Sequence, residues 1–118
     1  QSDKIFKFKG KKKSEKEKII RDAKLLDRAS VFCMVLECID TSLAKQVTKS
    51  ISVPTIGIGA SNNCDGQILV FDDLIGLNPI KVRFVKKYIN IKSQISKAVS
   101  KYASEVKIRK FPSKKYSY

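Results

Sequence analysis

VFCMVLE, at residues 31–37, is a run of six apolar residues that ends in a single carboxylate. Two further short runs follow, PTIGIGA at residues 54–60 and DGQILVFDD at residues 65–73. Each run is rich in β-branched and aliphatic residues and is bounded by Gly, Pro, Asn or Asp. This pattern is typical of strands that are buried on both faces of a parallel sheet. The chain is therefore expected to have an α/β fold.

The segment between the first two runs, residues 42–50, has a short helical pattern. Asp40, Thr41 or Ser42 is placed to cap this helix. A strand, a helix and a strand within about 30 residues form a βαβ unit. The inner face of the helix is expected to hold the apolar residues Leu43, Ala44, Val47 and Ile51.

Within the strand expected at residues 31–39, alternate side chains face opposite sides of the sheet. Phe32, Met34 and Leu36 are expected to face a helix layer. Glu37 is expected to face the other side, which would be the interior if the strands form a barrel. Chemistry in α/β folds is placed at the carboxyl ends of strands, so Glu37 is the candidate catalytic residue. The open alternative is a strand-end Glu that faces solvent or pairs with a Lys.

Helical patterns flank these strands in the sequence. Ser14 and Glu17 have the spacing of a capping box, which predicts a helix that ends near Ser30. After Pro79 a long helical pattern begins and is broken near Asn90. Its last part carries an apolar stripe over residues 91–106.

Two other patterns could indicate a ligand. The adjacent carboxylates of Asp72 and Asp73 could bind a hard cation, although a cap for the next helical turn is the favoured interpretation. Gly57 and Gly59 do not match a dinucleotide or phosphate loop. Because these glycines lack side chains, a bulky group is expected to lie against their strand.

The chain of 118 residues is long enough for one domain with one core. Its apolar runs are too short to cross a bilayer, and its first residues do not form a secretory signal. Cys33, Cys38 and Cys64 lack C-x-x-C spacing, and the sequence has no His to complete a zinc site. The cysteines are therefore interpreted as reduced thiols, and a cytoplasmic location is expected.

The formal charge is +14, from 25 basic and 11 acidic residues. Such a charge is compatible with a nucleic-acid or anionic-membrane surface. However, the basic residues are spread along the chain and only four of them are Arg, which is the residue that base recognition uses most. A basic nucleic-acid-binding module is therefore kept as the alternative to an enzyme, and no membrane partner is expected.

Three strings carry a family resemblance: VLEC at residues 35–38, PTIGIGA at 54–60 and CDGQILV at 64–70. Because these strings occur in this order and spacing, the chain resembles the C-terminal part of the 3-methyl-2-oxobutanoate (ketopantoate) hydroxymethyltransferase family. The resemblance covers nearly the whole chain. It implies that residues 1–118 are the C-terminal part of a single TIM-barrel domain. That part would comprise about three βα units plus C-terminal helices of a (β/α)₈ barrel, whose N-terminal half is absent from this chain.

The resemblance also implies a function in pantothenate biosynthesis. The family transfers a one-carbon unit from 5,10-methylenetetrahydrofolate to 3-methyl-2-oxobutanoate, with a bound Mg²⁺ that chelates the keto acid. The Glu of the Leu-Glu-Cys string is the catalytic base, and it matches Glu37. A carboxylate at an apolar strand end loses hydration, which favours this role. The metal ligands of the family lie upstream of Gln1, so no metal or cofactor ligand is assigned here.

The sequence departs from the family at Ser61, where a Gly is usual, and at Phe71 and Tyr116, where His is usual. A complete barrel needs about 250 residues, so the missing N-terminal half is the expected partner. A further alternative hypothesis is that the chain alone is an incomplete, inactive scaffold piece. Its unpaired strand edges are expected to make it self-associate, and the family forms homo-oligomers.

Overall fold

The computed structural model describes residues 8–79 and 81–118. The chain divides into two compact units. The first, called the sheet unit here, comprises Gln1–Val70 and Ile80–Val85. The second, called the tail unit, comprises Phe71–Pro79 and Lys86–Tyr118. The strands and the candidate catalytic residue all belong to the sheet unit.

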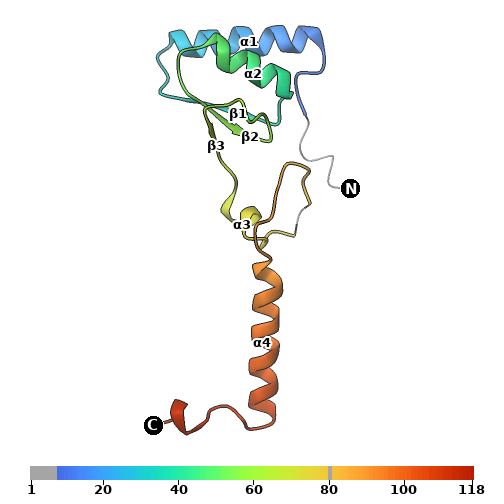
Figure 1. Ribbon diagram of the computed structural model, residues 1–118, viewed down its shortest axis with the longest axis vertical. Helices are drawn as coiled ribbons and strands as arrows, with labels where there is room; N and C mark the ends of the chain where they lie inside the picture. Colours follow the sequence, from blue (N-terminus) through green and yellow to red (C-terminus); the bar gives the residue numbers. More distant parts are fainter. Residues whose placement is uncertain (1–7, 80) are drawn as a thin grey trace. The chain divides into compact units, whose positions relative to one another are not determined.

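The described part of the sheet unit contains a parallel sheet with the strand order β1-β2-β3 (Figure 1). The strands are β1 Met34–Glu37, β2 Thr55–Ile58 and β3 Gly66–Gln67. The register places Glu37 opposite Ile58 at the carboxyl end of the first pair. The predicted parallel α/β arrangement is confirmed.

Two helices, α1 Lys13–Arg28 and α2 Thr41–Ser50, cover one face of the strands (Figure 1). Helix α2 connects β1 to β2, so the predicted βαβ unit is present. Its cap is Asp40, whose carboxylate accepts from the amides of Ser42 and Leu43. The buried core between the helices and the sheet consists of Ala23, Met34, Leu36, Ile39, Leu43, Ala44, Val47 and Cys64.

The faces of β1 alternate as the sequence predicts. Met34 and Leu36 are buried in the helix-side core. Val35 is 54% exposed and Glu37 is also exposed, so the opposite face of β1 is open in this chain. One helix-covered face and one open face carrying a carboxylate define where the site lies.

The first strand begins later than predicted, at Met34 and not at residue 31. The first ladder bond runs from the Met34 amide to the Pro54 carbonyl at 2.9 Å, and residues 31–33 precede it. Val31 is half-buried and packs against the core between the helices and the sheet. Phe32 is 91% exposed, so the prediction that it faces the helix layer is wrong.

The run at residues 65–73 is also less regular than predicted. Strand β3 contains only Gly66–Gln67, and a short helix, α3 Phe71–Leu74, follows it. Asp72 and Asp73 lie inside the first turn of α3. The interpretation of these aspartates as a cap for the following turn is therefore wrong, because the helix begins before them.

The predicted capping box of α1 is wrong too. The helix begins two residues earlier, with Lys12 as its N-cap and no side-chain cap bond. Glu15 accepts a hydrogen bond from the Gly10 amide at 2.8 Å. The carboxylate that ties down this end is therefore Glu15, and not Glu17.

The helical pattern after Pro79 forms a helix only in its second part. Residues 81–90 contain turns and bends, and residue 80 lies outside the described residues. Helix α4 spans Ile91–Lys107, and its cap is Asn90, which accepts from the Ser93 amide at 3.2 Å. The break predicted near Asn90 is therefore the beginning of the helix.

Helix α4 is the main element of the tail unit, and none of its residues is buried. The ring of Tyr102 in this helix lies edge to face with the ring of Phe111, which lies beyond the helix end, and their centroids are 5.4 Å apart. Phe111 also contacts Tyr116, which belongs to a 3₁₀ turn, η2 Lys114–Tyr116. Within the described part of the chain, no helix is both long and apolar enough to span a membrane.

Candidate functional site

Glu37 is the last residue of β1, at the carboxyl end of the parallel sheet. Its register partner is Ile58, the last residue of β2. Because paired residues in a parallel ladder share a face, Glu37, Val35 and Ile58 lie on the face opposite the helices. The candidate predicted from sequence thus lies at the edge where α/β folds place their sites. Its role as a base is a separate matter and stays a prediction.

The backbone after Glu37 is held from both sides. The Cys38 amide donates to the Ile58 carbonyl, and the Cys38 carbonyl accepts from the Lys9 amide, both at 2.9 Å. The Asp40 amide then donates to the Lys9 carbonyl, also at 2.9 Å. Lys9 thereby forms a parallel bridge with Ile39 beside β1. These bonds fix the direction in which the Glu37 side chain leaves the strand.

Cys38 has a left-handed backbone, with φ of 49°, which is unusual for a residue with a side chain. Such a conformation costs about 1–3 kcal/mol and persists only where surrounding bonds impose it. Burial raises the pKa of the Cys38 thiol, and the neighbouring Glu37 carboxylate raises it further. The thiol therefore stays protonated at neutral pH, and it acts as a buried packing group. Sequence reasoning identified the cysteine but had no signal for its strained backbone.

The start of α2 connects the ends of the first two strands. Asp40 accepts from the hydroxyl of Ser42, and this bond, with that of the Leu43 amide, lowers the pKa of the Asp40 carboxyl. A charged carboxylate at a helix N-terminus is also favoured by the helix dipole. Next to it, the Thr41 hydroxyl donates to the Ala60 carbonyl at 3.2 Å. The loops that follow β1 and β2 are therefore joined beside Glu37.

A second carboxylate fixes the start of β2. Asp65 accepts from the amide of Thr55 at 2.8 Å and from its hydroxyl at 3.0 Å. These bonds lower the pKa of Asp65. Thr55 is fully buried, and its hydroxyl also lies 2.9 Å from that of Thr48 on α2. Asp65 is exposed but structural, and sequence reasoning did not identify this contact.

Gly59 directly follows β2 and leaves room for an aromatic ring. Its φ is +61°, and a Cβ placed on it would lie 2.7 Å from Cγ of Phe84. Both the backbone and the contact therefore require glycine. The prediction that a bulky group lies against this strand is confirmed, and that group is Phe84. At Gly57 the neighbouring side chains are Gln67 and Cys64.

Among residues 8–79 and 81–118, no three His, Cys, Asp or Glu side chains lie together in a way that could hold a metal ion. The described residues therefore do not fit a Mg²⁺ site by themselves. Asp72 and Asp73, which could bind a hard cation by sequence, lie in α3 of the tail unit and are not part of such a group.

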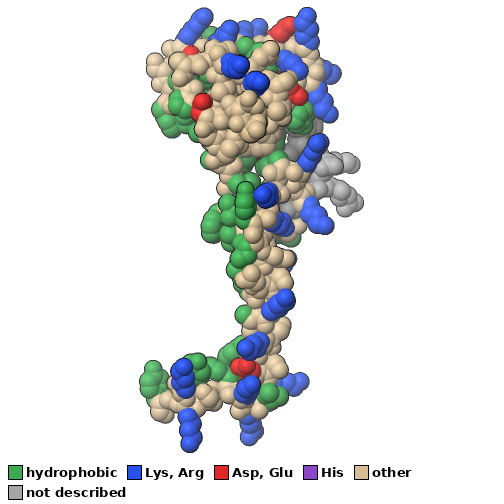
Figure 2. All heavy atoms as spheres, viewed as in Figure 1, with side chains coloured by type: hydrophobic (Ala, Val, Ile, Leu, Met, Phe, Trp, Pro, Cys, Tyr) green, Lys and Arg blue, Asp and Glu red, His purple; other side chains and the backbone are tan. Residues whose placement is uncertain are grey.

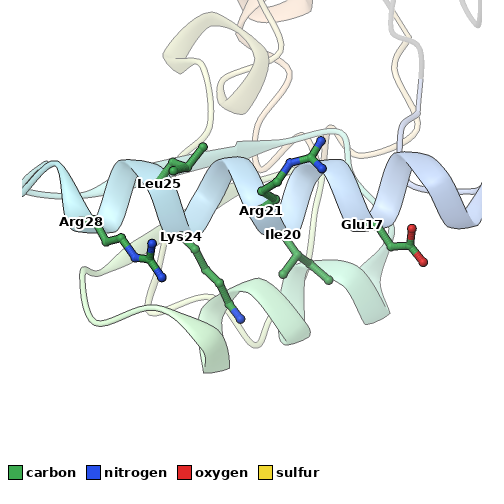
Figure 3. A pocket seen from close by; sticks show the side chains of 6 residues that line it. All are labelled: Glu17, Ile20, Arg21, Lys24, Leu25 and Arg28. Carbon is green, nitrogen blue, oxygen red and sulfur yellow. The ribbon is translucent and has the colours of Figure 1, made fainter.

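A surface hollow of about 320 Å³ lies along α1 (Figure 3). Its walls are side chains of α1 alone, and the view shows them spread along one helix without converging on a point. Three of them are cationic and one is acidic, which is ordinary for a solvated helix face. The lining residues are Glu17, Ile20, Arg21, Lys24, Leu25 and Arg28.

Basic side chains are distributed over both units in the space-filling view (Figure 2). They do not gather into a single patch on the face shown. This distribution agrees with the spacing of Lys along the sequence. It offers no specific support for nucleic-acid binding as the function.

The chain matches the family model described as ketopantoate hydroxymethyltransferase over residues 2–114. A 3-methyl-2-oxobutanoate hydroxymethyltransferase of Pelagibacter ubique is 60% identical over all 118 residues, which cover 46% of that relative. Enzymes of the same name from Enterococcus faecalis and Caulobacter vibrioides are each 46% identical over 96% of this chain. These alignments cover 42% and 41% of the two relatives. The chain thus spans less than half the length of the relatives it matches.

Proposed function

Because the chain belongs to the ketopantoate hydroxymethyltransferase family, we propose that it is the C-terminal part of such a transferase. The whole enzyme adds a hydroxymethyl unit to 3-methyl-2-oxobutanoate and gives ketopantoate for pantothenate biosynthesis. Among the individual residues, it is the position of Glu37 that supports the proposal. Its carboxylate lies at the carboxyl end of a parallel strand, inside the region that matches the family.

In the proposed reaction, Glu37 is the general base. Its carboxylate removes the proton from C3 of 3-methyl-2-oxobutanoate, and the electron pair of the C–H bond moves into the enolate. C3 then forms a carbon–carbon bond with the one-carbon unit of 5,10-methylenetetrahydrofolate. Both C–N bonds of that methylene group break, the oxygen of one water becomes the new hydroxyl oxygen, and the two protons of the water go to the folate nitrogens, which releases tetrahydrofolate. The proton taken up by Glu37 is returned to the new hydroxyl oxygen. General-base catalysis of this kind contributes roughly 10²–10⁴-fold to a rate.

The open face of the sheet supports an incomplete barrel. Val35 and Glu37 are exposed on the side that the barrel interior would occupy. We propose that the N-terminal half of the barrel covers this face and removes water from around Glu37. The Mg²⁺ implied by the family resemblance finds no ligand set among the described residues, and its ligands are proposed to lie in that half. A homo-oligomeric, cytoplasmic enzyme remains part of the same proposal.

The base role is tested in a chimera in which this chain replaces the matching 118 residues of the Pelagibacter ubique relative. Exchange of the C3 proton of the keto acid with solvent is followed by NMR, without the folate substrate. In Glu37→Gln, exchange should fall by about 10²-fold or more, because the amide cannot accept the proton. Glu17→Gln, an exposed change on α1, is the matched control and should leave exchange unchanged. Undiminished exchange in Glu37→Gln would remove Glu37 from the mechanism.

A further inference from the structure

Phe84 lies against the carboxyl end of β2, although it follows β3 and α3 in the sequence. Its half-buried ring occupies the space next to Gly59, where a Cβ would lie 2.7 Å from Cγ and 2.8 Å from Cδ1. The short turn that carries it is closed by a bond of 3.0 Å from the Val85 amide to the Val82 carbonyl. An aromatic ring is therefore fixed at the end of the sheet where chemistry is expected.

The position of this ring relative to Glu37 follows from the ladder. Glu37 pairs with Ile58, and the next amide, that of Cys38, donates to the Ile58 carbonyl at 2.9 Å. Gly59, which contacts the Phe84 ring, comes directly after Ile58. The ring thus contacts the neighbouring strand one residue beyond the register partner of Glu37. Ile58 itself is an apolar residue and is buried.

The substrate of the proposed reaction is apolar around the carbon atom that Glu37 deprotonates. The proton that Glu37 removes in the proposed reaction is on C3 of the oxo acid, and C3 also carries two methyl groups. When the base reaches that proton, the methyl groups lie within a few ångströms of the base. Apolar side chains with fixed positions are the groups that select ligand shape in such sites. Phe84 provides such a surface where it contacts Gly59, the residue that follows the register partner of Glu37.

We propose that Phe84 determines substrate specificity, its ring forming the apolar wall that limits the size of the alkyl branch at C3. This inference rests on the proposed function, because it assumes that the chain takes part in deprotonation of a branched 2-oxo acid. Gly59 contributes by allowing the ring to lie directly on the backbone. A larger residue at position 59 would displace the ring from the end of the sheet.

The test compares two substrates in the same chimera, 3-methyl-2-oxobutanoate and 3-methyl-2-oxopentanoate, which is larger by one methylene. One methylene in a specificity pocket corresponds to roughly 10–200-fold in kcat/KM. Phe84→Ala should raise the ratio of kcat/KM for the larger acid to that for the smaller by about tenfold or more. Phe84→Leu should shift the same ratio in the same direction by less, and it serves if the alanine variant does not fold. Phe71→Leu, at an exposed residue of the tail unit, is the matched control.

The outcomes separate this inference from the proposed function. An unsubstituted chimera that lacks activity on both acids would contradict the proposed function. An active chimera in which both Phe84 variants lose activity equally on the two acids would show that the ring only packs against Gly59. A changed ratio with C3 proton exchange retained assigns Phe84 to specificity, and not to the chemical step.

Discussion

The two units of this chain use similar amphipathic helices with different results. In α2, Leu43 and Val47 are completely buried. In α4, Val99 is 60% exposed and Tyr102 is 57% exposed, and no residue of that helix is buried. Figure 2 shows hydrophobic side chains on the surface of the tail unit. A helical stripe becomes a core only where a second apolar surface faces it, and β1 and β2 supply that surface in the sheet unit.

The same contrast holds for polar contacts. In the sheet unit, Asp27 at the end of α1 accepts from the Ser52 hydroxyl at 2.8 Å and from the amides of Ser52 and Val53 at 3.1 Å. These bonds join α1 to the loop before β2, and they lower the pKa of Asp27. The cap of α4, in contrast, is local, because Asn90 bonds to Ser93. The sheet unit is therefore expected to unfold cooperatively and α4 to fray.

The largest effect is expected from removing a buried side chain. Leu43→Ala should destabilise the sheet unit by about 3 kcal/mol, because it deletes apolar contacts and leaves a cavity. Ile95→Ala in α4 should cost less than about 1 kcal/mol, because Ile95 is 48% exposed. Urea unfolding with amide hydrogen exchange measures both. Equal costs would show that α4 has a buried partner surface in solution, and the contrast between the units would fail.

A smaller effect is expected from acid. Hydrogen bonds lower the pKa values of Asp27, Asp40 and Asp65, all in the sheet unit. Their stabilisation is fully present above the unfolded value of about 4, and it is lost as the pH falls through the lower folded values. The urea concentration at the unfolding midpoint of the sheet unit should therefore decrease as the pH drops below about 4. Asp65→Asn should make this dependence less steep, and a midpoint that is constant from pH 5 to 2 would contradict the assignment.

The smallest effect is expected at the helix ends. Ser30 after α1 has φ of 58°, and Arg109 after α4 has φ of 55°, a conformation that favours glycine. Ser30→Gly and Arg109→Gly should each stabilise their helix ends by up to about 1 kcal/mol. Ser30→Gly should raise the urea midpoint, whereas Arg109→Gly should only slow amide exchange near residues 108–111. A global gain from Arg109→Gly would show that α4 unfolds together with the sheet unit.

The elements predicted well are those whose signal is local. The apolar run that ends at Glu37, the helix at residues 42–50 and a cap among residues 40–42 all depend on residues close in sequence. The structure then identified Asp40 among the three cap candidates. Side-chain alternation also placed Met34, Leu36 and Glu37 on their correct faces. For Gly59, the lack of a side chain predicted a bulky neighbour, although nothing in the local sequence identified it as Phe84.

What the sequence alone determined is therefore the βαβ unit, the end of the sheet at which Glu37 lies, and the family. Only the tertiary structure decided where β1 begins, because its first ladder bond depends on Pro54, far along the chain. It also decided the left-handed backbone at Cys38, which hydrogen bonds to Lys9 and Ile58 impose. The contact between Phe84 and Gly59 was likewise decided only by the tertiary structure. Local propensity depends on neighbouring residues. These features, in contrast, arise from contacts between segments that are distant in sequence and become close only on folding.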